Sequence, residues 1–488
     1  MTPSTIPRNA PDNAPGEPPG EPPGEPSSEI PGEIAMDPPA ANTAAAATTE
    51  RLFASGRRAA CLGAIALISM LAFEAIAIAT AMPAVAAALN GLPLYALAFG
   101  ATLATAVLGM TAAGQLCDKR GPYRAAFAGL TAFLLGLLVA GFAPTMPWLV
   151  VGRALQGLGG GVLSVALYVG VARVVPAALH PRLFAMFAGA WVLPGLLGPV
   201  VASGLVQWLG WRSVFLAVAA AVPVAAALML PALRRVGEGT GEPLQWGAMR
   251  WALLASAGAL MLHAASQQHG QARSGLLVAG GVAVFIAARQ LLPAGTMRAA
   301  RGLPAVILLR GLIAAAFASA EAFVPLLLTQ QFAWSLAEAG LALSAGAVTW
   351  SLGSAVQARV PGEAARRRLL PAGFALAAAG LWVAMAPVAW AGLSSGWVVA
   401  GWVGVGLGIG LSFPMLSVLL LQRSLPEQQG ANTSALQLSD ALTCSAALGL
   451  AGWLFDPVTR QVLPVLLLAG VLAALAAVLS PRVWPRPD

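Results

Sequence analysis

The feature that most constrains this chain is a succession of apolar stretches, each about 20 residues long and therefore able to cross the roughly 30 Å hydrocarbon layer of a bilayer as a helix. Hydrophobic residues make up 58% of the 488 positions, charged residues only 9%, and the mean hydropathy is +0.78. That composition leaves too little polar surface for a water-soluble globule. The alternation typical of membrane β-barrels is absent. The sequence therefore predicts an all-α polytopic membrane protein.

We count fourteen candidate spans. They lie near residues 60–88, 93–116, 124–142, 147–174, 183–206, 212–232, 250–267, 275–293, 303–328, 336–357, 369–389, 396–421, 431–454 and 460–480.

The positions of Lys and Arg predict the orientation, because basic residues near span ends stay on the cytoplasmic side. With the N-terminus inside, most of them fall on the cytoplasmic side and only Arg212, Arg273 and Arg460 fall outside. Both termini are then cytoplasmic, and we expect a multi-pass protein of the cell's inner (plasma) membrane. The net charge of +8 is a topology signal and does not indicate nucleic-acid binding.

Residues 1–56 differ from the rest of the chain. The repeat "GEPPGEPPGEP", from Gly16 to Pro26, is acidic and Pro-rich, with too little apolar surface to fold. It lacks the basic start and apolar core of a secretory signal. We expect a disordered cytoplasmic tail, which leaves open a docking segment for a partner.

The cysteines and histidines are dispersed and show no metal-ligand spacing, so we expect neither a metal nor a cofactor. Cys61, Cys117 and Cys444 are interpreted as packing residues. Of the histidines, only His263 falls within a span; it could belong to a proton relay or simply lie near the outer end of its helix.

A cluster of charges, "GQLCDKRGPYR", lies between the second and third spans. Gly114 would allow close helix approach and Gly121 would permit a tight turn. Asp118 could accept hydrogen bonds from a neighbouring helix N-terminus while pairing with Arg124. A cytoplasmic loop that is merely basic is the alternative.

The same stretch resembles the loop signature of the major facilitator superfamily. Pro122 and Tyr123 stand where that signature is usually basic. The resemblance implies the major facilitator fold and a conformational gating role for the loop. The matching residues are Gly114, Leu116, Asp118, Lys119, Gly121 and Arg124.

An internal echo of the loop, "GSAVQARVPGEAARRR" from Gly353 to Arg368, follows the tenth span, with Gln357 where Asp118 stood. It favours two six-helix halves with two extra helices between them. The expected division is a tail at 1–56, an N-terminal half at 57–233, a linker with two spans at 234–302, a C-terminal half at 303–482 and a cytoplasmic end at 483–488.

Two further stretches resemble helix signatures of the drug:proton antiporters within this superfamily. "RALQGLGGG" has Arg153, Gln156 and Gly157 at the expected places. An Arg inside a span costs roughly 2.5–3.5 kcal/mol, so Arg153 should face a polar cavity or a partner, unless it snorkels to the outer surface.

"WVLPGLLGPVVASG" resembles the fifth-helix signature of the exporters, with Ala202 and Ser203 in place of the usual glycines. Gly and Pro together suit a hinge or a seal between halves, and packing alone is the alternative. The matching hinge residues are Gly195, Gly198 and Pro199.

The extra central spans, entered by "PLQWGAMRWALL", and the first-span stretch "FEAIAIATAMP" resemble the fourteen-helix drug:proton antiporter family of the multidrug efflux type. In that first-helix pattern Glu74 holds the acidic position, where Asp is more usual. The resemblance extends from about Arg57 to about Arg482.

Acidic residues inside the spans are scarce: Glu74, Glu321 and Asp440, with Glu338 at a span edge. A carboxylate in hydrocarbon must meet water, pair with a cation or hold a proton, and the last is what proton coupling requires. Structural hydrogen bonding is the alternative for each. Glu74 is the leading candidate, with Arg153 as its partner.

We therefore expect a proton-coupled exporter of amphiphilic drugs that works by alternating access and as a monomer, with proton-coupling or substrate residues Glu74, Arg153, Gln156, Glu321 and Asp440. The alternatives are a transporter of one metabolite, peptide, lipid or siderophore and, more remotely, a membrane-embedded enzyme. Dispersed acids and few histidines argue against an enzyme. The partners are a small-molecule substrate, protons and lipid, and no nucleic acid.

Overall fold

The computed structural model describes residues 57–484 apart from 176–185, 188, 236, 238–245, 361, 391, 426 and 427. Residues 51–488 form one compact unit, to which all that follows refers. The expected tail at 1–56 and the chain end at 485–488 lie outside the described residues.

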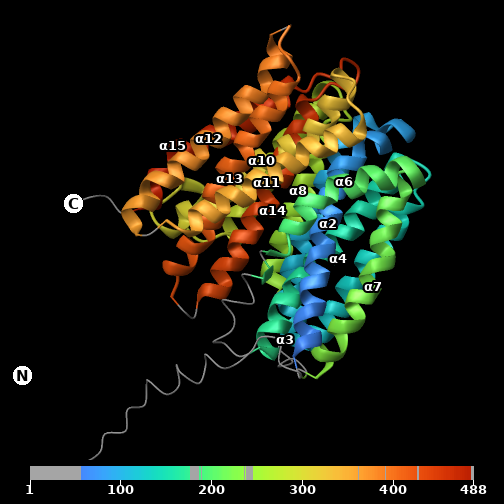
Figure 1. The fold of residues 1–488 in the computed structure, drawn as a ribbon. Coiled ribbons are helices and arrows are strands. Elements are labelled where there is room, and N and C mark those ends of the chain that lie inside the picture. Colours follow the sequence, from blue (N-terminus) through green and yellow to red (C-terminus); the bar gives the residue numbers. More distant parts are fainter. Residues whose placement is uncertain are drawn as a thin grey trace, which may run out of the picture. The chain divides into compact units, whose positions relative to one another are not determined.

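The described residues form thirteen long helices and no strand (Figure 1). Their bounds are α2 Arg58–Ala88, α3 Tyr95–Gly141, α4 Met146–Val174, α6 Val192–Leu209, α7 Arg212–Arg234, α8 Trp246–Ala265, α9 Gly270–Leu291, α10 Leu303–Gln331, α11 Leu336–Ala358, α12 Glu363–Ala389, α13 Gly396–Gln422, α14 Gln429–Leu454 and α15 Leu463–Leu479.

The all-α membrane architecture expected from the sequence is confirmed. Within the described residues, twelve segments are long and apolar enough to cross a bilayer, including both central helices α8 and α9. One of the twelve, Leu92–Gly141, has 50 residues and contains two of the expected spans, and α14 is a further long helix outside the twelve. The count of fourteen spans stays a prediction.

The expected turn between the second and third spans is reduced to one residue, Gly121. Its φ of 83° and ψ of 160° interrupt the helical backbone of α3, a conformation open to glycine and strained for other residues. Gly362, at the start of α12, has nearly the same values, φ 75° and ψ 161°. The similar stretch from Gly353 to Arg368 therefore contains a glycine with nearly the same backbone geometry, although Gln357 replaces the aspartate.

The expectation that Gly114 allows close helix approach is wrong. A Cβ atom placed there would have no neighbour within 4 Å, so this side of α3 is open. The close approach of α3 and α4 depends on other glycines: a Cβ at Gly157 would lie 2.0 Å from the Thr102 carbonyl oxygen, and one at Gly161 2.6 Å from that of Ala106.

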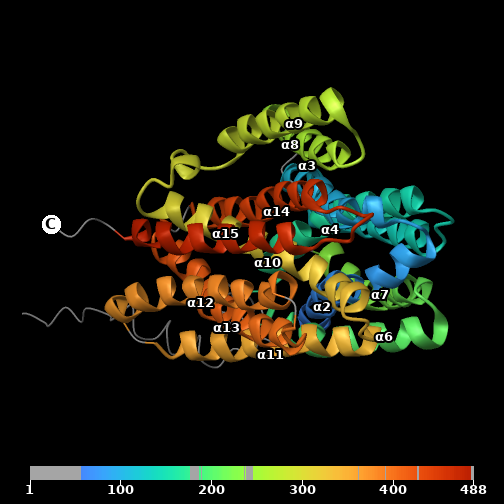
Figure 2. The same cartoon turned by 90° about the horizontal axis from the view of Figure 1, so that it is seen from above.

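The helices pack in two groups. The first group consists of α2, α3, α4, α6 and α7, which pack mainly on one another, and the second group consists of α10 to α15. The groups meet where α3 packs on α14 and where α6 packs on α11. Figure 2 shows α8 and α9 beside α3 and α14, with α9 outermost.

Several contacts between the groups lie near the end of the bundle where α3 begins and α14 finishes. We call it the Asp456 end, after the residue that follows α14 closely. The Tyr95 hydroxyl donates to the Ala322 carbonyl at 2.7 Å, and the Tyr95 and Phe323 rings lie 5.3 Å apart. A Cβ at Gly340 on α11 would lie 3.0 Å from the Pro199 carbonyl oxygen on α6. The groups are therefore in direct contact at this end.

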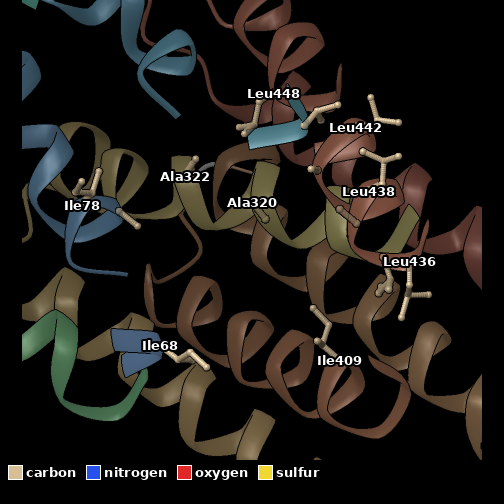
Figure 3. Close-up of a cluster of buried hydrophobic side chains, with 14 of the residues drawn as sticks. Ile68, Ile78, Ala320, Ala322, Ile409, Leu436, Leu438, Leu442 and Leu448 are labelled. Atoms are coloured by element: carbon tan, nitrogen blue, oxygen red, sulfur yellow. The ribbon is translucent and has the colours of Figure 1, made fainter. Parts of the chain in front are cut away.

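The buried core is aliphatic and continuous across both groups. Figure 3 shows Ile68 and Ile78 of α2, Ala320 of α10 and Ile409 of α13 together with leucines of α14, and all belong to one buried cluster. Small side chains fill much of this cluster and let helix backbones approach closely, which suits association in lipid.

Reporter fusions test the predicted number of spans. With fourteen spans, reporters placed after Arg58 and after Arg482 lie on the same side of the membrane, and a reporter after His269 lies on the opposite side, because seven spans precede it. Paired alkaline phosphatase and fluorescent protein fusions measure the side. Opposite readings at Arg58 and Arg482 would mean an odd number of spans.

Candidate functional site

A buried ion pair lies within the first group. Arg153 of α4 donates from Nη1 to the Glu74 carboxylate of α2 and, at 2.5 Å, to the Gln156 side-chain oxygen. Its Nε donates to the Ala98 carbonyl of α3 at 3.0 Å. Glu74 is 5% exposed and Arg153 4% exposed. The pairing expected from the sequence is present, and Arg153 does not snorkel to the surface.

The position of Arg153 follows from the close contact of α3 and α4. The Thr102 hydroxyl donates to the Arg153 carbonyl at 3.1 Å, and the Thr105 hydroxyl donates to the Ala154 carbonyl at 2.7 Å. Gly157, one turn further along α4, leaves room for both threonines. These bonds fix the α4 backbone against α3, so the guanidinium group is directed toward Glu74 on α2.

A second ion pair lies within the second group. Arg310 of α10 donates from Nε to the Asp440 carboxylate of α14 at 3.0 Å and from Nη1 to the Ser417 hydroxyl of α13 at 2.7 Å. Its guanidinium carbon lies 3.2 Å from the centroid of the Phe413 ring. The side chains are 12% and 22% exposed for Arg310 and Asp440, so this pair is more accessible than the first.

Sequence reasoning missed this second pair. It placed Asp440 among the functional carboxylates but assigned it no partner. The partners are 130 residues apart in the chain, and the packing of α10 on α14 brings them together. The signal available was Arg310 itself, since an arginine inside a span requires a partner.

Glu321, also on α10, has no ion pair or hydrogen bond within the described part of the chain, and it is partly accessible. The helices thus hold three internal carboxylates and two internal guanidinium groups, and each guanidinium is engaged by a carboxylate other than Glu321. One carboxylate is therefore left over. It can be neutralised by a proton or by a cation from outside the protein.

The contact of α11 with α13 repeats that of α3 with α4. Thr349 of α11 donates to the Val403 carbonyl of α13 at 2.9 Å, as Thr105 does to Ala154. A Cβ at Gly406 would lie 2.4 Å from the Thr349 hydroxyl, and one at Gly157 2.3 Å from the Thr105 hydroxyl. The two helix pairs use the same small-residue and threonine chemistry.

The chemistry next to these contacts differs between the groups. Arg153 lies four residues before Gly157 on α4, and Trp402 lies four residues before Gly406 on α13. Trp402 stacks on Phe317 of α10 at 5.3 Å between centroids, and Trp350 meets Phe317 edge-on at 5.1 Å. The second group therefore carries an aromatic cluster where the first group carries the Glu74 ion pair.

The loop and hinge residues lie apart from the ion pairs. Asp118, Lys119 and Arg124 lie within two turns of Gly121, at the break in α3. On α6, a Cβ at Gly195 would lie 3.4 Å from Ala347 of α11, and one at Gly198 would lie 3.3 Å from Ile76 of α2. The expected hinge segment therefore packs between the two groups.

Two further candidates, Glu338 and His263, lie outside both ion pairs. Glu338 is exposed and caps α11: its backbone nitrogen donates to the Ser335 hydroxyl at 3.2 Å, while its carboxylate accepts from the Ser335 backbone at 2.8 Å. His263 is buried in α8, next to Gly100 of α3. Among the described residues, no group of three or more His, Cys, Asp or Glu is placed to hold a metal ion.

Comparison with known proteins identifies the class. The family model described as Major Facilitator Superfamily matches residues 62–447, most of the chain. This chain therefore belongs to the major facilitator superfamily and is a transporter rather than an enzyme.

Two relatives are named for multidrug efflux or for multidrug resistance. The chain is 28% identical over 454 residues to the "Probable multidrug-efflux transporter Rv1634" of Mycobacterium tuberculosis, covering 87% of this chain and 94% of that protein. It is 30% identical over 154 residues to "Multidrug resistance protein 3" of Bacillus subtilis, covering 32% and 30%.

Solved structures share the fold. A crystal structure of a POT family transporter in complex with 5-aminolevulinic acid matches with a TM-score of 0.65 at 16% identity, over 88% of this chain and 96% of that chain. At this identity the likeness concerns the arrangement of helices alone.

Removing one partner of the Arg310–Asp440 pair should destabilise the protein more than removing both. Breaking a buried pair costs roughly 3–5 kcal/mol because it leaves one uncompensated charge, and the access at Asp440 lowers that figure. We expect Arg310→Met to lower the unfolding midpoint in detergent, and Arg310→Met with Asp440→Leu to recover part of the loss.

The exposed pair Arg367–Glu363 on α12 is the matched control, since surface pairs contribute about 0–1 kcal/mol. Arg367→Met should leave the midpoint nearly unchanged. Equal midpoints for Arg310→Met and the parent protein would show that the second pair contributes nothing to stability.

Proposed function

We propose that this transporter exports amphiphilic drugs, above all lipophilic monocations, in exchange for protons. The leading observation is the unequal number of internal charges. The described helices hold three internal carboxylates and two internal guanidinium groups, and among the described residues Glu321 is the carboxylate without an ion pair. A proton or a monocation neutralises Glu321, but both together do not, so binding of one displaces the other.

The aromatic cluster supports a substrate with an apolar, ring-bearing body. Phe317 lies one helical turn before Glu321 on α10, and its ring contacts Trp350 and Trp402. Aromatic faces attract cations and flat apolar groups. Two relatives are named for multidrug efflux or resistance, which supports the same substrate class.

Transport then proceeds by alternating access. The first and second groups act as the two halves, with α8 and α9 as the linker helices, and they rock about the internal carboxylates. The present structure corresponds to a state closed at the Asp456 end, where Tyr95 bonds to Ala322. The α6 segment around Gly198 and Pro199 serves as part of that seal, and the loop at Asp118 and Gly121 influences the balance of states.

The remaining internal groups position and tune the site. In the proposed cycle Glu74, Arg153 and Gln156 keep the interior of the first group neutral, and Asp440 with Arg310 does so in the second. Protonation of Glu74 or Asp440 would free its arginine and so alter the packing of the helices that carry the pair. The distribution of Lys and Arg supports cytoplasmic termini in the inner membrane, with the Asp456 end outside.

Replacing Glu321 by Gln tests the proposal directly. The amide keeps the shape and the hydrogen-bonding capacity of the side chain but removes its charge and its titration. We expect export of a lipophilic monocation to fall about tenfold or more, since an interaction with a charged group contributes roughly 1.5–3 kcal/mol. A neutral amphiphile should still move down its own concentration gradient, and this movement should no longer depend on pH. Efflux from cells at matched protein amounts gives both values.

Glu338→Gln is the matched control, because Glu338 is an exposed carboxylate at the start of α11. It should behave like the parent protein. If Glu321→Gln exports the monocation at the parent rate with the parent pH dependence, Glu321 is not the exchange site.

A further inference from the structure

The central helices α8 and α9 form a rigid hairpin. A Cβ at Gly258 of α8 would lie 2.9 Å from the Gly280 carbonyl oxygen of α9, and one at Gly280 would lie 2.7 Å from that of Gly258. Backbones this close leave no space for sliding without repacking. Any contact that either helix makes is therefore a contact of the whole hairpin.

One side of the hairpin is fixed to α3 of the first group. The buried Ser256 hydroxyl donates to the Ala104 carbonyl at 2.7 Å, and the Gln267 amide donates to the Pro93 carbonyl. Between them, the His263 ring occupies the space that Gly100 leaves: a Cβ on Gly100 would come within 1.8 Å of His263 Nε2. Only glycine at position 100 admits this ring.

The other side of the hairpin is fixed to α14 of the second group. A Cβ at Gly449 would lie 2.8 Å from the Cβ of Leu262, so α8 and α14 approach closely there. Arg273 of α9 donates to the Trp453 carbonyl at 3.0 Å, and its guanidinium carbon lies 5.3 Å from the centroid of the Trp453 ring. The hairpin thus touches both groups.

These contacts surround the place where α3 and α14 meet. The Ser445 hydroxyl of α14 donates to the Gly100 carbonyl at 3.1 Å, next to the His263 ring. A Cβ at Gly452 of α14 would lie 2.8 Å from the Ala96 Cβ and 3.8 Å from Ser266. The hairpin lies along this seam, as Figure 2 shows for α8, α3 and α14.

We propose that the α8–α9 hairpin is a clasp that holds the two groups together at the Asp456 end. Its central contact is the His263 ring, which fills the space beside Gly100. The proposal rests on the rocking motion of the proposed function. Because the hairpin bonds to both groups, separating α3 from α14 at this end breaks one of its two sets of contacts. Contacts made in only one state shift the equilibrium toward that state. The clasp therefore favours the state closed at the Asp456 end and sets how readily this end opens.

Spectroscopic distances in the full-length protein test the clasp without any substrate. Nitroxide labels at Trp208→Cys on α6 and Val458→Cys beyond α14 occupy exposed sites on opposite groups, in a background with Cys61, Cys117 and Cys444 changed to Ala. Electron–electron resonance gives the populations of the short and long distances.

Gly100→Ala should displace His263 and increase the population with the long distance about tenfold. Adding His263→Ala makes room for the new methyl group, and the population should return to that of His263→Ala alone. Gly281→Ala is the matched control, because a Cβ there meets nothing within 4 Å.

A second pair of variants, at exposed or partly exposed arginines, tests the clasp in case Gly100→Ala does not fold. Arg273→Ala removes the bond to Trp453 and should increase the population with the long distance about threefold or more. Arg289→Ala, at the exposed far end of α9, should not change that population. The parent protein could show two distances whose proportions change in neither Gly100→Ala nor Arg273→Ala. That result would overturn the clasp but not the rocking motion. A single distance in every variant and at every pH and substrate concentration would overturn the clasp together with the rocking motion.

Discussion

The structure depends on how charge is accommodated inside a bundle of apolar helices. Each group of helices contains one arginine well inside a span, and each arginine is held by a carboxylate from another helix of the same group and by a further side-chain oxygen, that of Gln156 or of Ser417. An unpaired charge there would cost several kcal/mol, so these contacts also determine which helices lie together. Once both arginines are satisfied, Glu321 is the internal carboxylate that has no ion pair among the described residues, and we propose that it serves transport.

The two groups are related in construction but differ in the side chains beside their shared helix contact. Threonine and glycine make the same close contact between α3 and α4 as between α11 and α13, and Gly121 and Gly362 have the same backbone geometry. Next to that shared contact, the first group has Arg153 and the second has Trp402. The aromatic cluster of Phe317, Trp350 and Trp402 lies in the same group as Glu321, which suits a substrate that is both charged and apolar.

The sequence predicted the fold class and part of the site for reasons that are local. Apolar runs of helix length predict spans. The pairing of Glu74 with Arg153 could be predicted because both residues lie within spans of the same half. The Arg310–Asp440 pair was missed, because joining them requires knowledge of which helices pack across 130 residues. Gly114 was assigned a packing role that its open surroundings do not support. The place of α8 and α9 along the seam has no hydropathy signal, since lipid-facing and protein-facing apolar surfaces look alike in sequence.

The central claim is that one unpaired carboxylate exchanges one proton for one monocation. Proteoliposomes holding the purified protein and a trapped pH-sensitive dye measure this directly when a lipophilic monocation is added outside an acidic lumen. The account predicts that each cation entering is matched by one proton leaving, at a rate that an imposed membrane potential does not change, because the exchange moves no net charge. Cation accumulation driven by voltage without a pH gradient, or cation entry without proton release, would contradict it.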